Sequence, residues 1–83
     1  MCRYAWYQGP PRQVLLTYYC DRARHLVCEP YSLANLHRMA AALGLGRHWF
    51  HKDHYDIPAH RRTEIMARCV LVPSREIVNI IGR

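Results

Sequence analysis

The sequence predicts an α+β fold, a small sheet of about three strands packed against three helices. Three observations support this: a β-forming run at residues 14–20, an apolar stripe of helical spacing at 33–43, and a strand-like run followed by another helical pattern at 69–81. The chain has 83 residues, of which 51% are hydrophobic and 22% charged, so we expect one globular domain spanning residues 1–83. The expected order is ββα, then a loop, then αβα.

The first half of the chain contains the signals for a hairpin. Aromatic residues at 2–7 are compatible with an edge strand, and Pro10-Pro11 interrupts regular structure because proline fixes φ and lacks an N–H donor. Residues 14–20 form the best strand pattern, and residues 25–28 the return strand after a polar turn.

Three helices are expected after the hairpin. Ser32 is a suitable N-cap for the first, and Gly44 and Gly46 end it. Its buried stripe is expected to consist of Leu33, Leu36, Ala40 and Leu43.

Pro58 suits the first turn of a second helix that runs to about Arg68, with Asp56 as its cap. After a strand at 69–72, Pro73-Ser74 begins the last helix, whose buried face is expected to be Ile77, Ile80 and Ile81.

Charge and cysteine content restrict the class of protein. The net charge is +6, and eleven of the twelve cationic residues are arginine, whose planar fork suits phosphate or carboxylate. The four cysteines form no CxxC pair, and no apolar run reaches the about 18 residues that could span a membrane. Residues 1–7 lack the basic and apolar regions of a signal peptide, so none is expected. We therefore expect a cytoplasmic protein with reduced thiols and no membrane partner.

The most distinctive chemistry lies in the run RHWFHKDHYDIPAHRR at residues 47–62. His48, His51 and His54 recur at every third position, whereas helical zinc motifs place two histidines four apart, and no cysteine is near. The spacing therefore predicts no metal site within this run, and no cofactor is expected.

Within the run, His54-Tyr55-Asp56 precedes a predicted helix start. If Asp56 caps that helix, the free N–H groups of the first turn form an anion site that Arg61 and Arg62 close. His54 is then a candidate proton donor or acceptor. The alternative is a plain capping aspartate beside a histidine that packs against Trp49.

Aromatic residues surround this segment, and they have two interpretations. Trp49 and Tyr55 are placed to stack on a nucleobase or line a pocket, or to anchor the loop to the core. His37, at the margin of the first helix's apolar stripe, either points toward the same region or is a core-edge histidine.

The stretch HLVCEPYSLANLHRMAAALGLGRHWFHKDHYDIPAHRRTEIMARCVLV resembles a small bacterial and phage family, domain of unknown function 4031. The resemblance rests on an LHxxA helix, an RxWF turn, the HYD triplet, a basic helix and a V-rich strand, followed by an RELV-type helix. It covers roughly residues 16–82 and leaves residues 1–12 as an N-terminal extension. Glu29 stands where the family pattern has aspartate, and the interval before His25 is short.

The resemblance implies a grouping of histidines and carboxylates across the sheet edge, suited to acid–base chemistry or to a metal with open positions. Its members are Asp21, His25, His37, His54 and Asp56. The resemblance also implies a phage or mobile-element setting, in which small proteins antagonise host defences by binding.

Three functions follow as hypotheses. The first is a module that binds nucleic acid or a nucleotide; its ligand-binding residues are Arg47, Trp49, Tyr55, Arg61, Arg62 and His37. The second is a hydrolase or nuclease with catalytic His54, Asp56, Asp21 and His25. The third is an inhibitor that docks on a protein of a host defence system, with its aromatic N-terminal segment as an added contact surface. The sequence does not decide between an enzyme and a binding protein, and it leaves the oligomeric state open.

Overall fold

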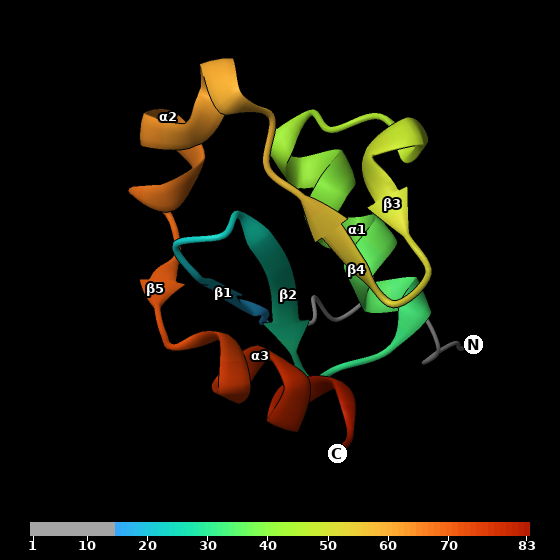
Figure 1. Cartoon of the computed structure of the whole chain (residues 1–83). Helices are drawn as coiled ribbons and strands as arrows, with labels where there is room; N and C mark the ends of the chain where they lie inside the picture. Colours follow the sequence, from blue (N-terminus) through green and yellow to red (C-terminus); the bar gives the residue numbers. More distant parts are fainter. Residues whose placement is uncertain (1–14) are drawn as a thin grey trace, which may run out of the picture.

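A computed structural model describes residues 15–83 (Figure 1). The predictions for residues 2–7, Pro10-Pro11 and the extension 1–12 concern residues outside this range. The part of the inhibitor hypothesis that relies on the N-terminal segment also concerns residues outside it.

The described chain forms a five-stranded mixed sheet in the order β3-β4-β2-β1-β5. Strands β1 (Thr17–Cys20) and β2 (His25–Glu29) form the predicted antiparallel hairpin. Strand β4 (His54–Asp56) pairs antiparallel with β2, and β3 (Phe50–His51) pairs antiparallel with β4. Strand β5 (Val70–Leu71) runs parallel to β1 at the other edge.

The α+β class is confirmed, but the prediction of about three strands is wrong. The missing strands, β3 and β4, lie within the histidine-rich run that was expected to be a loop. They contain only two and three residues, and a tight turn connects them, in which Lys52 has a φ of 64°. A pattern of alternating burial is hard to recognise over so few positions, because Tyr55 is the single fully buried residue in β4.

The register of the strands assigns side chains to the two faces of the sheet. Leu26 is opposite Tyr55, which is opposite Phe50, so these three side chains share one face. His25 is opposite Asp56, and therefore both point to the other face. His54, two residues before Asp56, points to that same face.

Helix α1 (Leu33–Leu43) covers the face that carries Leu26 and Tyr55 (Figure 1). Its predicted caps are confirmed: Ser32 Oγ accepts a hydrogen bond from the Asn35 N–H at 3.0 Å, and Gly44 closes the helix with a φ of 73°. Leu33, however, is 52% exposed. The buried apolar residues of the helix are Leu36, Met39, Ala40 and Leu43.

Helix α3 (Ser74–Ile81) lies against β1 and β2, at the bottom of the view in Figure 1. It buries Ile77 and Ile80 as expected, whereas Ile81 is only partly buried. Beyond its end, Arg83 forms an ion pair with Glu29, whose side chain shares a face with His25. The helix thus covers the β1–β2 half of the second face and leaves His54 and Asp56 on β4 partly exposed.

The prediction of the second helix is wrong about where the helix begins, how long it is and which residue caps it. A 3₁₀ turn occupies Ala59–Arg61, and α2 is only Arg62–Met66. Asp56 does not cap it, because Asp56 belongs to β4 and pairs with His25. Neither segment has a side-chain hydrogen bond at its N-cap, and this leaves the helix start without the predicted stabilisation.

The described thiols are free, with Cys20 and Cys28 buried and Cys69 partly buried. Within residues 15–83, no helix combines the length and the apolar character needed to cross a membrane.

Candidate functional site

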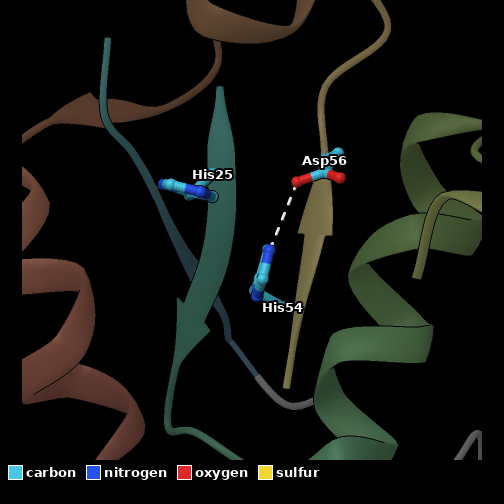
Figure 2. Close-up of side chains that lie close together, drawn as sticks. All are labelled: His25, His54 and Asp56. Carbon is cyan, nitrogen blue, oxygen red and sulfur yellow. Dashed lines mark ion pairs between the residues drawn. The ribbon is translucent and has the colours of Figure 1, made fainter. Parts of the chain in front are cut away.

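A cluster of two histidines and one carboxylate lies on the second face of the sheet, and its side chains are partly exposed. Figure 2 shows the three residues. His25 comes from β2, and His54 and Asp56 come from β4. His54 Nε2 lies 3.2 Å from Asp56 Oδ1, and the two imidazole rings meet edge to face with centroids 4.9 Å apart. One potential ligand atom from each residue lies within 4.8 Å of the other two.

Strand geometry explains why the sequence HYD builds this arrangement. Alternate side chains of a strand point to opposite faces, so His54 and Asp56 face the cluster while Tyr55 faces the core with none of its surface exposed. The β2–β4 ladder then places Asp56 directly opposite His25. Two short strands therefore bring together residues that are about thirty positions apart in the sequence.

Asp21 fixes the position of His25. Its carboxylate is 1% exposed; one oxygen accepts the backbone N–H of His25 at 2.9 Å, and the other lies 2.8 Å from His25 Nδ1. The hydroxyl of Ser74, at the start of α3, donates to that second oxygen at 2.6 Å. Burial by itself raises the pKa of Asp21, but the hydrogen bonds from Ser74 and His25 outweigh it, so the pKa is lowered and the group stays ionised.

His54 also has a carboxylate at its Nδ1, but this one belongs to the partly exposed Asp53 and contacts the ring alone. The Nδ1 of His54 lies 2.8 Å from Asp53 Oδ1, while its Nε2 is the atom near Asp56. Both histidines of the cluster thus have a carboxylate at Nδ1, and each retains Nε2 for a ligand, a proton or Asp56. A carboxylate at one ring nitrogen fixes the tautomer and makes the other nitrogen more basic.

A cleft of about 260 Å³ adjoins the cluster. Its walls are formed by Ala23, Arg24, His25, Trp49, Asp56 and Ile57. Arg24 adopts a left-handed backbone with a φ of 72°, and its guanidinium donates to the Ile57 carbonyl at 3.3 Å. A cation and an indole therefore lie beside an imidazole and a carboxylate, which suits a ligand with both an anionic and a planar part.

A larger pocket of about 420 Å³ lies elsewhere, between Arg22 and the segment of residues 71–74. It has one ionisable side chain, Arg22, and shares only Ser74 with the groups described above. Chemistry needs several convergent polar groups, so we place the site at the smaller cleft.

Four of the predicted site residues come together: Asp21, His25, His54 and Asp56. His37 does not join them, because its Nδ1 lies 2.7 Å from the hydroxyl of Tyr55 on the opposite face of the sheet. Tyr55 is part of the core, whereas Trp49 packs against the core and also lines the cleft.

The predicted anion site at the second helix does not form, because Asp56 lies in β4 and α2 has only five residues. Arg61 directs its guanidinium to the Leu43 carbonyl at 2.7 Å and to the carboxylate of Glu64, also at 2.7 Å. Arg47 and Arg62 are exposed.

Sequence reasoning missed Arg24 and Ser74. Arg24 directly precedes His25 in the turn between β1 and β2, and its adjacency to a candidate catalytic residue was a usable signal. Ser74 is 53 positions from Asp21, and no local pattern connects the two.

Within residues 15–83, the group that could hold a metal ion is His25, His54 and Asp56, which offers two imidazole nitrogens and one carboxylate oxygen. This donor set fits a divalent transition metal that keeps open coordination positions.

Comparison with known proteins adds a family but no activity. A family model described as "Protein of unknown function (DUF4031)" matches residues 16–83. The search of curated proteins and the search of solved structures each find no match.

Proposed function

Because the chain belongs to the DUF4031 family of proteins of unknown function, its activity has to be inferred from its site, and we propose that it is a phosphoester hydrolase. The substrate class we propose is a nucleotide or nucleic acid that enters the cleft beside Arg24 and Trp49.

One observation carries the proposal. Two histidines, each with a carboxylate at Nδ1, lie next to each other and to the third carboxylate, Asp56, on a partly exposed face of the sheet. One ligand atom from each of His25, His54 and Asp56 lies within 4.8 Å of the other two. A histidine with a purely structural role needs only one hydrogen-bond partner for its ring. Two imidazoles that are both held by carboxylates, beside a third carboxylate, are typical of a site that activates water.

In the proposed reaction the cluster takes a proton from a water molecule, and the water oxygen attacks phosphorus. The P–O ester bond breaks, and the cluster returns the proton it took from water to the leaving oxygen as the alcohol is released. Asp21 keeps His25 oriented throughout, because its ionised carboxylate stabilises positive charge on the ring.

The cleft supports a phosphate-bearing substrate. Arg24 offers a guanidinium whose planar fork suits phosphate oxygens, and Trp49 offers a surface for base stacking. The net charge of +6 attracts polyanions and increases the rate of encounter.

The proposal is tested by incubating the full-length protein with bis(4-nitrophenyl) phosphate, with nucleotides and with a single-stranded oligonucleotide. His54→Ala and Asp56→Asn are expected to reduce turnover by at least about 100-fold, which is the lower range for loss of acid–base catalysis. His60→Ala is the matched control, because His60 is exposed in the 3₁₀ turn. Arg24→Ala should raise KM more than it lowers kcat.

Thermal melts of every variant separate catalysis from folding. The proposal fails if the wild-type protein hydrolyses none of these substrates, or if the His54→Ala protein, folded as judged by its melt, turns over at the wild-type rate.

Binding of nucleic acid without turnover is the second candidate, and the exposure of Arg47 and Arg62 favours it. In that case wild-type affinity for the oligonucleotide should fall steeply with rising salt, and Arg47→Ala with Arg62→Ala should reduce the slope. Affinity that does not change with salt would exclude this candidate.

A further inference from the structure

We propose that His25, His54 and Asp56 bind one divalent transition-metal ion, with Zn²⁺ as the preferred ion. The inference deepens the proposed function and rests on it for the role of the metal. A bound ion would activate the attacking water in place of His54 Nε2 and Asp56 as free proton acceptors, because those atoms would then be its ligands. Its measurement, however, requires no substrate.

The distances among the donor atoms are close to those of a coordination sphere. A tetrahedral ion with ligands about 2.0–2.1 Å away separates those ligands from one another by about 3.3 Å. His54 Nε2 and Asp56 Oδ1 are already 3.2 Å apart, and all three donors lie within 4.8 Å of one another. A modest rotation of the half-buried side chains closes the remaining gap around an ion.

The groups behind the donors match a metal site as well. A histidine that ligates a metal usually donates its second ring N–H to a carboxylate or a carbonyl. Here both histidines meet that condition, His25 through Asp21 at 2.8 Å and His54 through Asp53 at 2.8 Å. Asp21 is in turn fixed by Ser74, so the support extends to α3.

The donor set also selects the class of ion. Two imidazole nitrogens with one carboxylate oxygen suit Zn²⁺ and its first-row neighbours, whereas Mg²⁺ and Ca²⁺ prefer oxygen ligands throughout. Three protein ligands leave positions for water and substrate, as in catalytic zinc sites, and the cleft lies on that open side.

The competing explanation needs no metal. A protonated His54 can donate to Asp53 through Nδ1 and to Asp56 through Nε2, which satisfies both contacts. The two explanations differ in one measurable respect, because only the metal site binds an ion stoichiometrically and loses it when His25 is removed.

The experiment uses the full-length protein after treatment with a chelator. Zn²⁺ is titrated in competition with a chromogenic chelator, and Co²⁺ is titrated while visible absorption is recorded. We expect one equivalent of either ion, and a Co²⁺ spectrum without the intense near-ultraviolet band that thiolate ligands produce. Loss of a residue that supports a ligand typically weakens metal binding by about 10–100-fold, and Asp53→Asn should fall in that range. Loss of a ligand itself should weaken binding by more than this, so we expect a larger effect from each of the variants His25→Ala, His54→Ala and Asp56→Asn.

His60→Ala is again the matched control and should bind as the wild type does. Absence of stoichiometric Zn²⁺ and Co²⁺ binding by the wild type overturns the inference, as does binding that persists in both His25→Ala and Asp56→Asn. Asp56 is partly exposed, so its isosteric change keeps the test valid if a histidine variant fails to fold.

The outcome is separable from that of the proposed function. Stoichiometric Zn²⁺ binding without hydrolysis of any phosphoester removes the proposed function and leaves the metal site. If the protein binds no Zn²⁺ and a chelator does not reduce its hydrolysis of a phosphoester, the metal site is excluded and the proposed function remains.

Discussion

Asp21 holds His25 through both of its carboxylate oxygens, one bonded to the backbone N–H at 2.9 Å and one to ring Nδ1 at 2.8 Å. Position and ring orientation are therefore set by the same buried group. A histidine held in this way loses less entropy when it binds a ligand than one on a free rotamer.

Replacing Asp21 with Asn should destabilise the protein by about 1.5–3 kcal/mol at pH 7, because a hydrogen-bonded buried charge is lost. Since the folded pKa of Asp21 is lowered, its contribution is complete above the unfolded value near 3.8 and disappears as the pH falls through the folded value. Urea unfolding of both proteins at pH 7, and at steps below pH 4, measures this. A stability difference that stays constant at acid pH would contradict the assigned role.

Arg61 and Arg62 are neighbours with different expected roles. Arg61 bonds the C-terminal carbonyls of α1 and the carboxylate of Glu64, so Arg61→Ala should lower the melting temperature. Arg62 is exposed, and Arg62→Ala should leave the melt unchanged. Equal melting temperatures for the two variants would mean that the contacts of Arg61 do not stabilise the fold.

Tyr55→Phe tests the assignment of His37 to the core. The change removes the 2.7 Å contact between the Tyr55 hydroxyl and His37 Nδ1, and it should cost about 0.5–1.5 kcal/mol, measured by urea unfolding. Zn²⁺ affinity should not change, because the pair lies on the face opposite the cluster. Loss of Zn²⁺ binding in a folded Tyr55→Phe protein would show that the two faces are coupled.

The three described thiols should resist modification in the native state. Burial raises the pKa of Cys28 to about 11 and, together with the nearby Cys20, raises that of Cys69 to about 12. At pH 8 the thiolate fraction of Cys28 is then about one in a thousand. Replacing Cys2 with Ser leaves only these three thiols to react. The native variant should react slowly with a thiol-specific disulfide reagent, whereas in denaturant it should react with three equivalents of the reagent. Rapid native reaction would indicate that this part of the fold opens readily.

The elements predicted correctly are those with strong local signals. The first helix has a side-chain cap, an apolar stripe and a glycine at its end, and the β1–β2 hairpin has β-forming runs on both sides of a polar turn. The hairpin of β3 and β4 is too short, and its residues are too weakly β-forming, to be predicted from local sequence. It is stabilised instead by the pairing of β4 with β2, which is a tertiary contact.

The same distinction applies to the site. His54 and Asp56 were expected to act together, but at a helix start, whereas a strand places them on one face opposite His25. The family resemblance pointed to Asp21 and His25, which residue patterns alone would not have connected to the HYD triplet. The part played by Ser74 depends on the packing of α3, which no local pattern encodes.

The hydrogen bond from Ser74 to Asp21 joins the last helix of the domain to the turn after its first described strand. When β1, β2 and β4 have paired but α3 has not yet docked, the histidines are already close to one another while Asp21 still lacks its third hydrogen bond, the one from Ser74. The site then reaches its final geometry only when the C-terminal helix docks. A chain shortened before α3 would retain every residue of the His25–His54–Asp56 cluster and yet lack the contact that completes its alignment.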